Sequence, residues 1–93
     1  MSKITESTIL EFEQVASMRS VGEGAVILLA DSGQLYTCNE TSETILRDMG
    51  KQRSVGDMVA LLCEDFDITK ESATADVIEI TENLIEEGIL RVV

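Results

Sequence analysis

The chain has 93 residues, enough for one domain with a modest core, and its 44% apolar content is too high for a disordered chain. With 18 acidic against 7 basic residues, the formal net charge is -11, so the chain would repel nucleic-acid phosphates and anionic membrane surfaces. It has no histidine, no closely spaced cysteine pair and no nucleotide-binding glycine motif, so neither a metal site nor an enzyme is expected.

The first third of the chain predicts a three-stranded antiparallel meander. The first ten residues are weakly patterned and are expected to be a frayed lead-in. Strands are predicted over residues 11–18, 25–30 and 34–38, and the continuous apolar run of the second one indicates burial on both faces. The glycine-containing segments 21–24 and 31–33 would form the two hairpin turns, because glycine accepts the positive φ that tight turns need.

Three helices are predicted to follow. Each begins after a short polar side chain that can cap the free N–H groups of a first turn, at Asn39, Ser54 and Thr69. The first helix would run to about Met49 and end at Gly50, and the third would end at Gly88. Residues 89–93 would form a short strand or an extended tail. This order predicts an α+β fold of the winged helix-turn-helix type, as a single domain over residues 1–93 with its core at about 11–91.

The third predicted helix carries two apolar stripes, which together are wider than a surface helix needs to cover one core. One stripe is Ala73, Val77, Ile80 and Leu84, and the adjacent one is Thr74, Ile78, Thr81 and Ile85. The opposite arc is acidic, with no Lys or Arg between Lys70 and Arg91. Two interpretations of the second stripe stay open: it forms the wall of a groove for a partner, or it packs on the sheet or another helix.

Other readings of the residues are less favoured. Cys38 and Cys63 are predicted to be buried thiols in a reducing compartment, in preference to a disulfide. Core packing is also favoured over catalysis for Cys38, because no basic partner that would activate it is apparent in the sequence. A DNA-reading winged helix is disfavoured because its acidic third helix would lie against phosphates. A carrier protein is disfavoured because Ser32 is followed by Gly33 and a strand, not by a helix. No long apolar segment occurs near the N-terminus, so a cytoplasmic protein is expected.

Three stretches of the chain together resemble the PqqD family, also called recognition elements of ribosomally synthesised and post-translationally modified peptides (RiPPs). They are GAVILLADSGQLYTCNETSETIL, RSVGDMVALLCEDFDI and ATADVIEITENLIEEGIL, and the similarity covers about Gly22 to Leu90. Their order and spacing follow the family pattern: an apolar strand, G-x-x-Y-x-L-N-E, a helix, an R-T-V-like start of the second helix, and a D-V-containing helix ending in G-L. The resemblance implies a winged-helix-like domain of three strands followed by three helices.

The resemblance also implies a function. The protein would be a non-catalytic chaperone that binds the leader of a precursor peptide and presents it to a modifying enzyme, often a radical SAM enzyme, without a cofactor of its own. The pathway would be pyrroloquinoline quinone synthesis or another peptide pathway, such as that of lasso peptides. The alternative is an interaction or regulatory domain of the same fold that binds a folded partner. Exposed strand edges are compatible with a monomer or a strand-exchanged dimer.

The family's leader adds as a further strand beside the third strand and packs against the third helix. Carried over, the docking strand would contain Leu35, Tyr36, Thr37 and Cys38, and the helical wall would contain Ala73, Val77, Ile78, Thr81 and Ile85. Cys38 stands where the family usually has Leu, and Thr81 where an apolar residue is common, so the groove would be smaller or more polar. The acids of the third helix would favour a leader that bears Lys or Arg.

Overall fold

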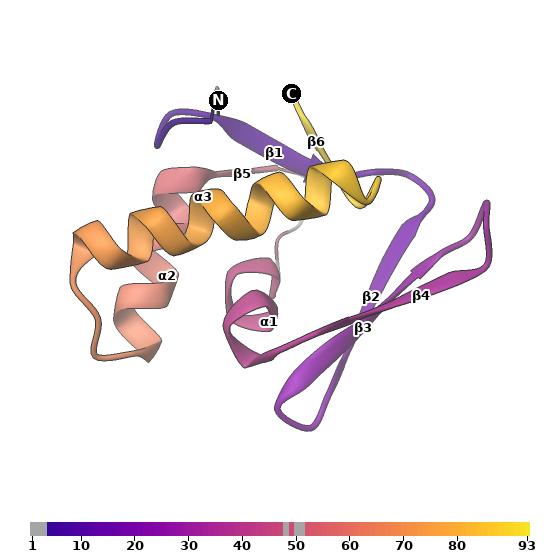
Figure 1. Cartoon of the computed structure of the whole chain (residues 1–93), viewed down its shortest axis with the longest axis horizontal. Helices are drawn as coiled ribbons and strands as arrows, with labels where there is room; N and C mark the ends of the chain where they lie inside the picture. The colour runs from indigo at the N-terminus through magenta and orange to yellow at the C-terminus, as the bar shows by residue number, and fades with distance from the viewer. Residues whose placement is uncertain (1–3, 48, 50–51) are drawn as a thin grey trace.

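A computed structural model of the chain describes residues 4–47, 49 and 52–93. Within these ranges the chain forms three helices and two small sheets (Figure 1). The elements in chain order are β1 (Ile9–Phe12), β2 (Ala16–Val21), β3 (Gly24–Leu29), β4 (Gln34–Cys38), α1 (Glu40–Leu46), β5 (Arg53–Ser54), α2 (Val55–Asp65), α3 (Lys70–Glu86) and β6 (Leu90–Val92). The predicted α+β class, with an antiparallel meander followed by three helices, is confirmed.

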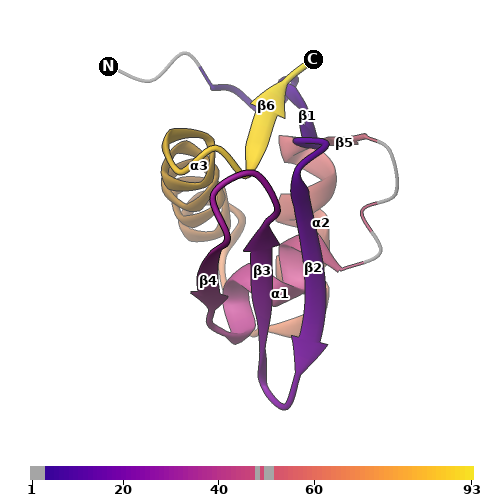
Figure 2. The same ribbon diagram turned by 90° about the vertical axis from the view of Figure 1, so that its right-hand side faces the viewer.

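The meander consists of β2, β3 and β4 in that spatial order, joined by the two predicted turns. Gly22 and Gly33 have φ values of 54° and 74°, which explains why glycine stands at these turns. The prediction that the apolar run of β3 is buried on both faces is wrong. Ile27 points to the core and is fully buried, whereas Leu28 is 41% exposed on the outer face. Only one face of the meander is covered by helices, so alternate residues of β3 remain at the surface (Figure 2).

The second sheet was not predicted. It contains β5, β1 and β6 in that order, with β1 antiparallel to both neighbours. The expected frayed lead-in therefore supplies part of β1, where Leu10 is fully buried and pairs with Val92. The expected single strand over residues 11–18 is instead divided between the end of β1 and the start of β2. Such short strands depend on partners far along the chain, so they have little local sequence signature.

All three predicted helix caps are present. The backbone N–H of Ser42 donates to Asn39 Oδ1 at 2.9 Å, and the Ser54 and Thr69 side chains cap α2 and α3 in the same way. Helix α3 ends at Glu86, and Gly88 follows with a φ of 78°, as expected for a glycine that ends a helix.

Helix α1 ends at Leu46, earlier than the predicted Met49, and the predicted stop at Gly50 lies outside the described residues. Arg47 has extended backbone angles and caps the helix through its N–H, which donates to the carbonyl of Glu43. The guanidinium of Arg53 donates to the carbonyl oxygens of Ile45 at 3.2 Å and Arg47 at 2.9 Å. These bonds satisfy carbonyls that a longer helix would otherwise have paired.

The core lies between the inner face of the meander and the helices. Its fully buried members are mainly aliphatic, as the low aromatic content requires, and include Ile27, Ile45, Leu62, Val77 and Leu84. In Figure 2 α1 and α2 lie behind the meander, while α3 stands to the side of β4. β4 is therefore the strand of the meander that lies nearest to α3.

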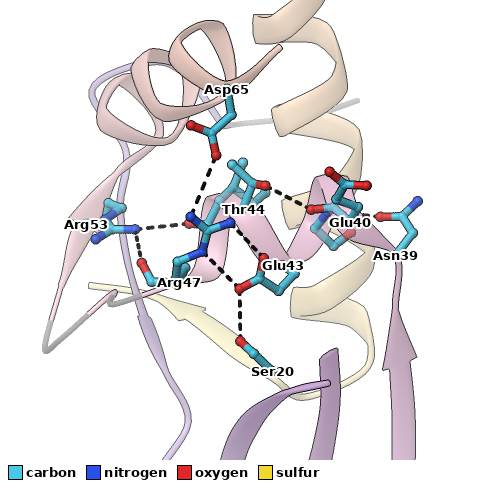
Figure 3. Close-up of polar contacts among 10 residues, drawn as sticks. Ser20, Asn39, Glu40, Glu43, Thr44, Arg47, Arg53 and Asp65 are labelled. Atoms are coloured by element: carbon cyan, nitrogen blue, oxygen red, sulfur yellow. Dashed lines mark hydrogen bonds and ion pairs between the residues drawn. The ribbon is translucent and has the colours of Figure 1, made fainter. Parts of the chain in front are cut away.

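A buried carboxylate connects three elements of the fold (Figure 3). Glu43 on α1 accepts a hydrogen bond from Ser20 Oγ on β2 at 2.9 Å and two from the Arg47 guanidinium at 2.9 and 3.0 Å. Arg47 also lies 3.7 Å from a carboxylate oxygen of Asp65 on α2. The hydrogen bonds from Arg47 lower the pKa of Glu43 below its ordinary value of 4.5, against the opposing effect of burial. The charged form of Glu43 therefore helps to hold α1 against the meander.

Replacing Gly24 with Ala should destabilise the fold by about 1–3 kcal/mol. A Cβ at Gly24 would collide with the backbone carbonyl oxygen of Cys38, at the end of β4. The free energy of unfolding from urea titration measures the effect. Gly22→Asn is the control, because Gly22 has open space around it and Asn tolerates positive φ. Equal stability of the two variants would show that β4 can move away from Gly24 without cost.

Replacing Glu43 with Gln should lower the free energy of unfolding at neutral pH, because it removes the charge that Arg47 binds. The loss should be only about 1–2 kcal/mol, because Arg47 is half-exposed and solvent partly screens the pair. Since the folded-state pKa of Glu43 is lowered, its contribution is complete above the unfolded pKa near 4.5 and is lost as pH falls through the lower folded value. The difference between wild type and Glu43→Gln should therefore be constant at neutral pH and shrink in acid. Glu64→Gln, at an exposed position of α2, is the control. A difference that stays constant into strong acid would contradict this role.

Candidate functional site

The outer edge of β4 is open within the described chain. β4 pairs with β3 on one side, and no other described strand pairs with it. An edge strand presents unpaired N–H and C=O groups from alternate residues, which can bind an additional strand. Figure 2 shows this edge on the side of the meander nearest to α3.

The side chains of β4 alternate between two environments. Leu35 is 68% exposed and, like Thr37, lies on the outer face of the meander. Tyr36 is half-buried opposite Ile27, and Cys38 is buried on the same inner face. All four predicted docking-strand residues therefore lie on the edge strand. Their backbone atoms form its free edge, whereas their side chains lie on the two faces of the meander.

Three of the five predicted wall residues of α3 face the core. Ala73, Val77 and Thr81 are each fully buried. The hydroxyl of Thr81 donates to the carbonyl oxygen of Val77 at 2.8 Å, so its polar group is satisfied inside the helix's own backbone. These residues pack α3 against the core and offer no exposed surface to a ligand.

The other two predicted wall residues, Ile78 and Ile85, are half-buried. Ile78 lies on the flank of α3 that faces the N-terminal segment. Ile78 and Thr74 line a hollow of about 550 Å³, which we call the N-terminal hollow. Its other lining residues are Glu6, Lys70, Glu71 and Ala75. A carboxylate oxygen of Glu6 lies 3.9 Å from Lys70 Nζ, so the N-terminal hollow lies on the side of α3 that faces the N-terminal segment. Ile85 follows Ile78 by two helical turns and is expected on the same flank.

The opposite flank of α3 faces the start of α1, next to the end of β4. A hollow of about 220 Å³ lies there, which we call the β4–α3 hollow. Its lining residues are Asn39, Thr41, Asp76, Glu79 and Ile80. Of the isoleucines of α3, Ile78 lines the N-terminal hollow and Ile80 lines the β4–α3 hollow. The placement of Ile78 in the wall beside the docking strand stays a prediction. Sequence reasoning placed Ile80 and Ile78 on adjacent apolar stripes and left open which stripe faces the groove, because both flanks of α3 carry isoleucine and periodicity does not distinguish them.

The β4–α3 hollow is acidic and its charge is not balanced locally. Among the ion pairs of the described ranges, none includes Asp76 or Glu79. The two bases that bracket α3 in sequence are paired elsewhere, Lys70 with Glu6 and Arg91 with Glu11. Exposed carboxylates without a cation give this flank a negative potential that attracts positively charged groups.

Reactive chemistry is not evident at this site. Burial raises the pKa of the Cys38 thiol, which keeps it protonated and weakly nucleophilic. Over the residues that the structure describes, no group of three or more His, Cys, Asp or Glu side chains is placed to hold a metal ion. None of the described helices combines the length and apolar character that crossing a bilayer requires.

Comparison with known proteins identifies the family. The family described as Coenzyme PQQ synthesis protein D (PqqD) matches residues 24–90, and the chain belongs to this family. None of the curated proteins matches the chain in sequence.

Two solved structures share the fold. One is described as lasso peptide synthetase B1 complexed with the leader peptide; it is 21% identical, with a TM-score of 0.74 over 88% of this chain and 96% of that one. The other is described as TbiB1 in complex with the TbiA(beta) leader peptide; it is 13% identical, with a TM-score of 0.73 over 85% of this chain and 93% of that one. The agreement over nearly the whole of each chain supports the arrangement of β4 and α3 described above.

The two cysteines should differ in reactivity. In the folded protein, iodoacetamide should alkylate half-buried Cys63 faster than Cys38, which is 9% exposed and has a raised pKa. Mass spectrometry of proteolytic peptides after timed labelling measures both rates, and labelling in urea provides the unfolded control. Faster labelling of Cys38 in the folded state would show that β4 opens and exposes its inner face.

Proposed function

We propose that this protein binds the leader segment of a ribosomally synthesised precursor peptide and presents it to a modifying enzyme. The observation that carries the proposal is the open edge of β4 beside a hollow of α3, in a chain of the PqqD family. The descriptions of both similar structures name a bound leader peptide, which supports the same class of ligand.

The leader would bind by adding a strand to the meander. Backbone groups of Leu35, Tyr36, Thr37 and Cys38 would form the main-chain hydrogen bonds, which provide affinity with little demand on sequence. Inward side chains of the added strand would then lie against the flank of α3 that carries Ile80. Because one strand and a small hollow bury limited area, we expect an affinity in the nanomolar to micromolar range.

The protein would act without catalysis of its own. The β4–α3 hollow offers an amide, a hydroxyl, two carboxylates and an aliphatic side chain, but no nucleophile with an adjacent base. The chemistry would belong to a partner enzyme, for example a radical SAM enzyme of pyrroloquinoline quinone synthesis or an enzyme of lasso-peptide synthesis. Precursor peptides are made on ribosomes, so the protein would act in the cytoplasm, as a monomer or as a dimer that exchanges strands.

Replacing Ile80 with Asp should weaken leader binding by about tenfold or more, because it removes apolar contact from the flank that faces β4. The matched control is Ile78→Asp, the same change at a half-buried position on the opposite flank of the same helix. Titration calorimetry would use synthetic N-terminal segments of the small peptides encoded beside the gene. Circular dichroism verifies that both variants fold. If Ile80→Asp does not fold, Ile80→Ala is used in its place.

The result also separates the alternatives. Loss of binding with Ile78→Asp alone would move the site to the N-terminal hollow. Absence of binding by every leader to folded wild-type protein would contradict leader recognition and favour a folded protein partner.

A further inference from the structure

The β4–α3 hollow has the size and chemistry of a site for one long, positively charged side chain. Its volume of about 220 Å³ is below the roughly 300–1,000 Å³ of typical small-molecule pockets, so it suits a single side chain. Its polar lining is dominated by hydrogen-bond acceptors, because it includes the carboxylates of Asp76 and Glu79. Ile80 supplies an apolar wall against which the methylene stem of Lys or Arg can pack.

The two carboxylates are available to a ligand. Neither belongs to an ion pair among the described residues, and both side chains are exposed. Two other acids differ in this respect: Glu43 is bound by Arg47, and Glu6 lies beside Lys70. A leader with Asp or Glu at this point would add like charge to the hollow, so the site discriminates by repulsion as well as attraction.

The hollow lies next to the C-terminal end of β4. Asn39 follows the last residue of β4, and its side-chain oxygen is held by the backbone N–H of Ser42 at 2.9 Å. This cap fixes one wall of the hollow relative to the strand edge. A peptide that pairs with β4 and continues past its end at Asn39 would bring one side chain to Asp76 and Glu79.

We infer that the β4–α3 hollow selects a leader with a Lys or Arg at one defined position, and that Asp76 and Glu79 determine this preference. The inference rests on the proposed function and names the class of peptide that it serves. Each exposed pair contributes modestly, so removing both charges should weaken binding about three- to tenfold. The loss should be larger at low salt, because salt screens exposed pairs.

Selection from a random peptide library displayed on phage tests the inference without knowledge of the natural leader. Wild-type protein should enrich peptides that share an extended apolar pattern and carry Lys or Arg at one position of that pattern. Asp76→Asn/Glu79→Gln should lose the enrichment at that position and bind the selected synthetic peptide about three- to tenfold more weakly. Glu71→Gln/Glu82→Gln removes the same charge from other positions of α3 and should keep both properties.

The outcomes distinguish this inference from the proposed function. Peptides that bind wild type but not Ile80→Asp, without a fixed cationic position, would overturn the inference and leave leader binding intact. Equal weakening by both double variants would overturn it as well, because general attraction to an acidic protein would then explain the effect. Failure to enrich any peptide on folded wild-type protein would overturn both.

Discussion

The cap at Asn39 is the interaction on which the arrangement of the site depends. Its side chain accepts from the N–H of Ser42, so α1 starts at Glu40, with only the cap between it and β4. The chain therefore leaves the sheet at once and passes beneath the meander, and no strand of the described ranges other than β3 pairs with β4. The same cap places Asn39 and Thr41 opposite α3, where they form one side of the β4–α3 hollow.

Glu43 and the pair Asp76 and Glu79 are carboxylates with different consequences. Glu43 is buried and satisfied by Ser20 and Arg47, so its charge contributes to the position of α1. Asp76 and Glu79 are exposed and lack a described cationic partner, so they contribute little to the fold and much to the potential of the β4–α3 flank. Part of the net charge of -11 therefore lies on the β4–α3 flank, where it acts on ligands in addition to favouring solubility.

Local signals in the sequence predicted the meander, the three caps and the order of the helices, since turns and caps depend on a few adjacent residues. They did not reveal β1 or β5, whose formation depends on pairing between Leu10 and distant residues such as Val92 and Arg53. They also did not show which flank of α3 faces β4. Ile78 and Ile80 are equally apolar, and only tertiary packing separates the two flanks, with Glu6 beside one and Asn39 and Thr41 beside the other.

Strand addition alone leaves the position of a peptide poorly defined. Main-chain hydrogen bonds repeat along β4, so a bound strand can shift along the edge with little change in backbone pairing. A side chain held at the β4–α3 hollow would remove this freedom, because only one register would bring a cation to Asp76 and Glu79. Under the proposed function, a single charged position would fix the register of the leader and therefore where the rest of the precursor leaves the protein toward a modifying enzyme. The backbone edge and the acidic hollow would then have separate roles: the edge supplies most of the affinity, and the hollow sets alignment.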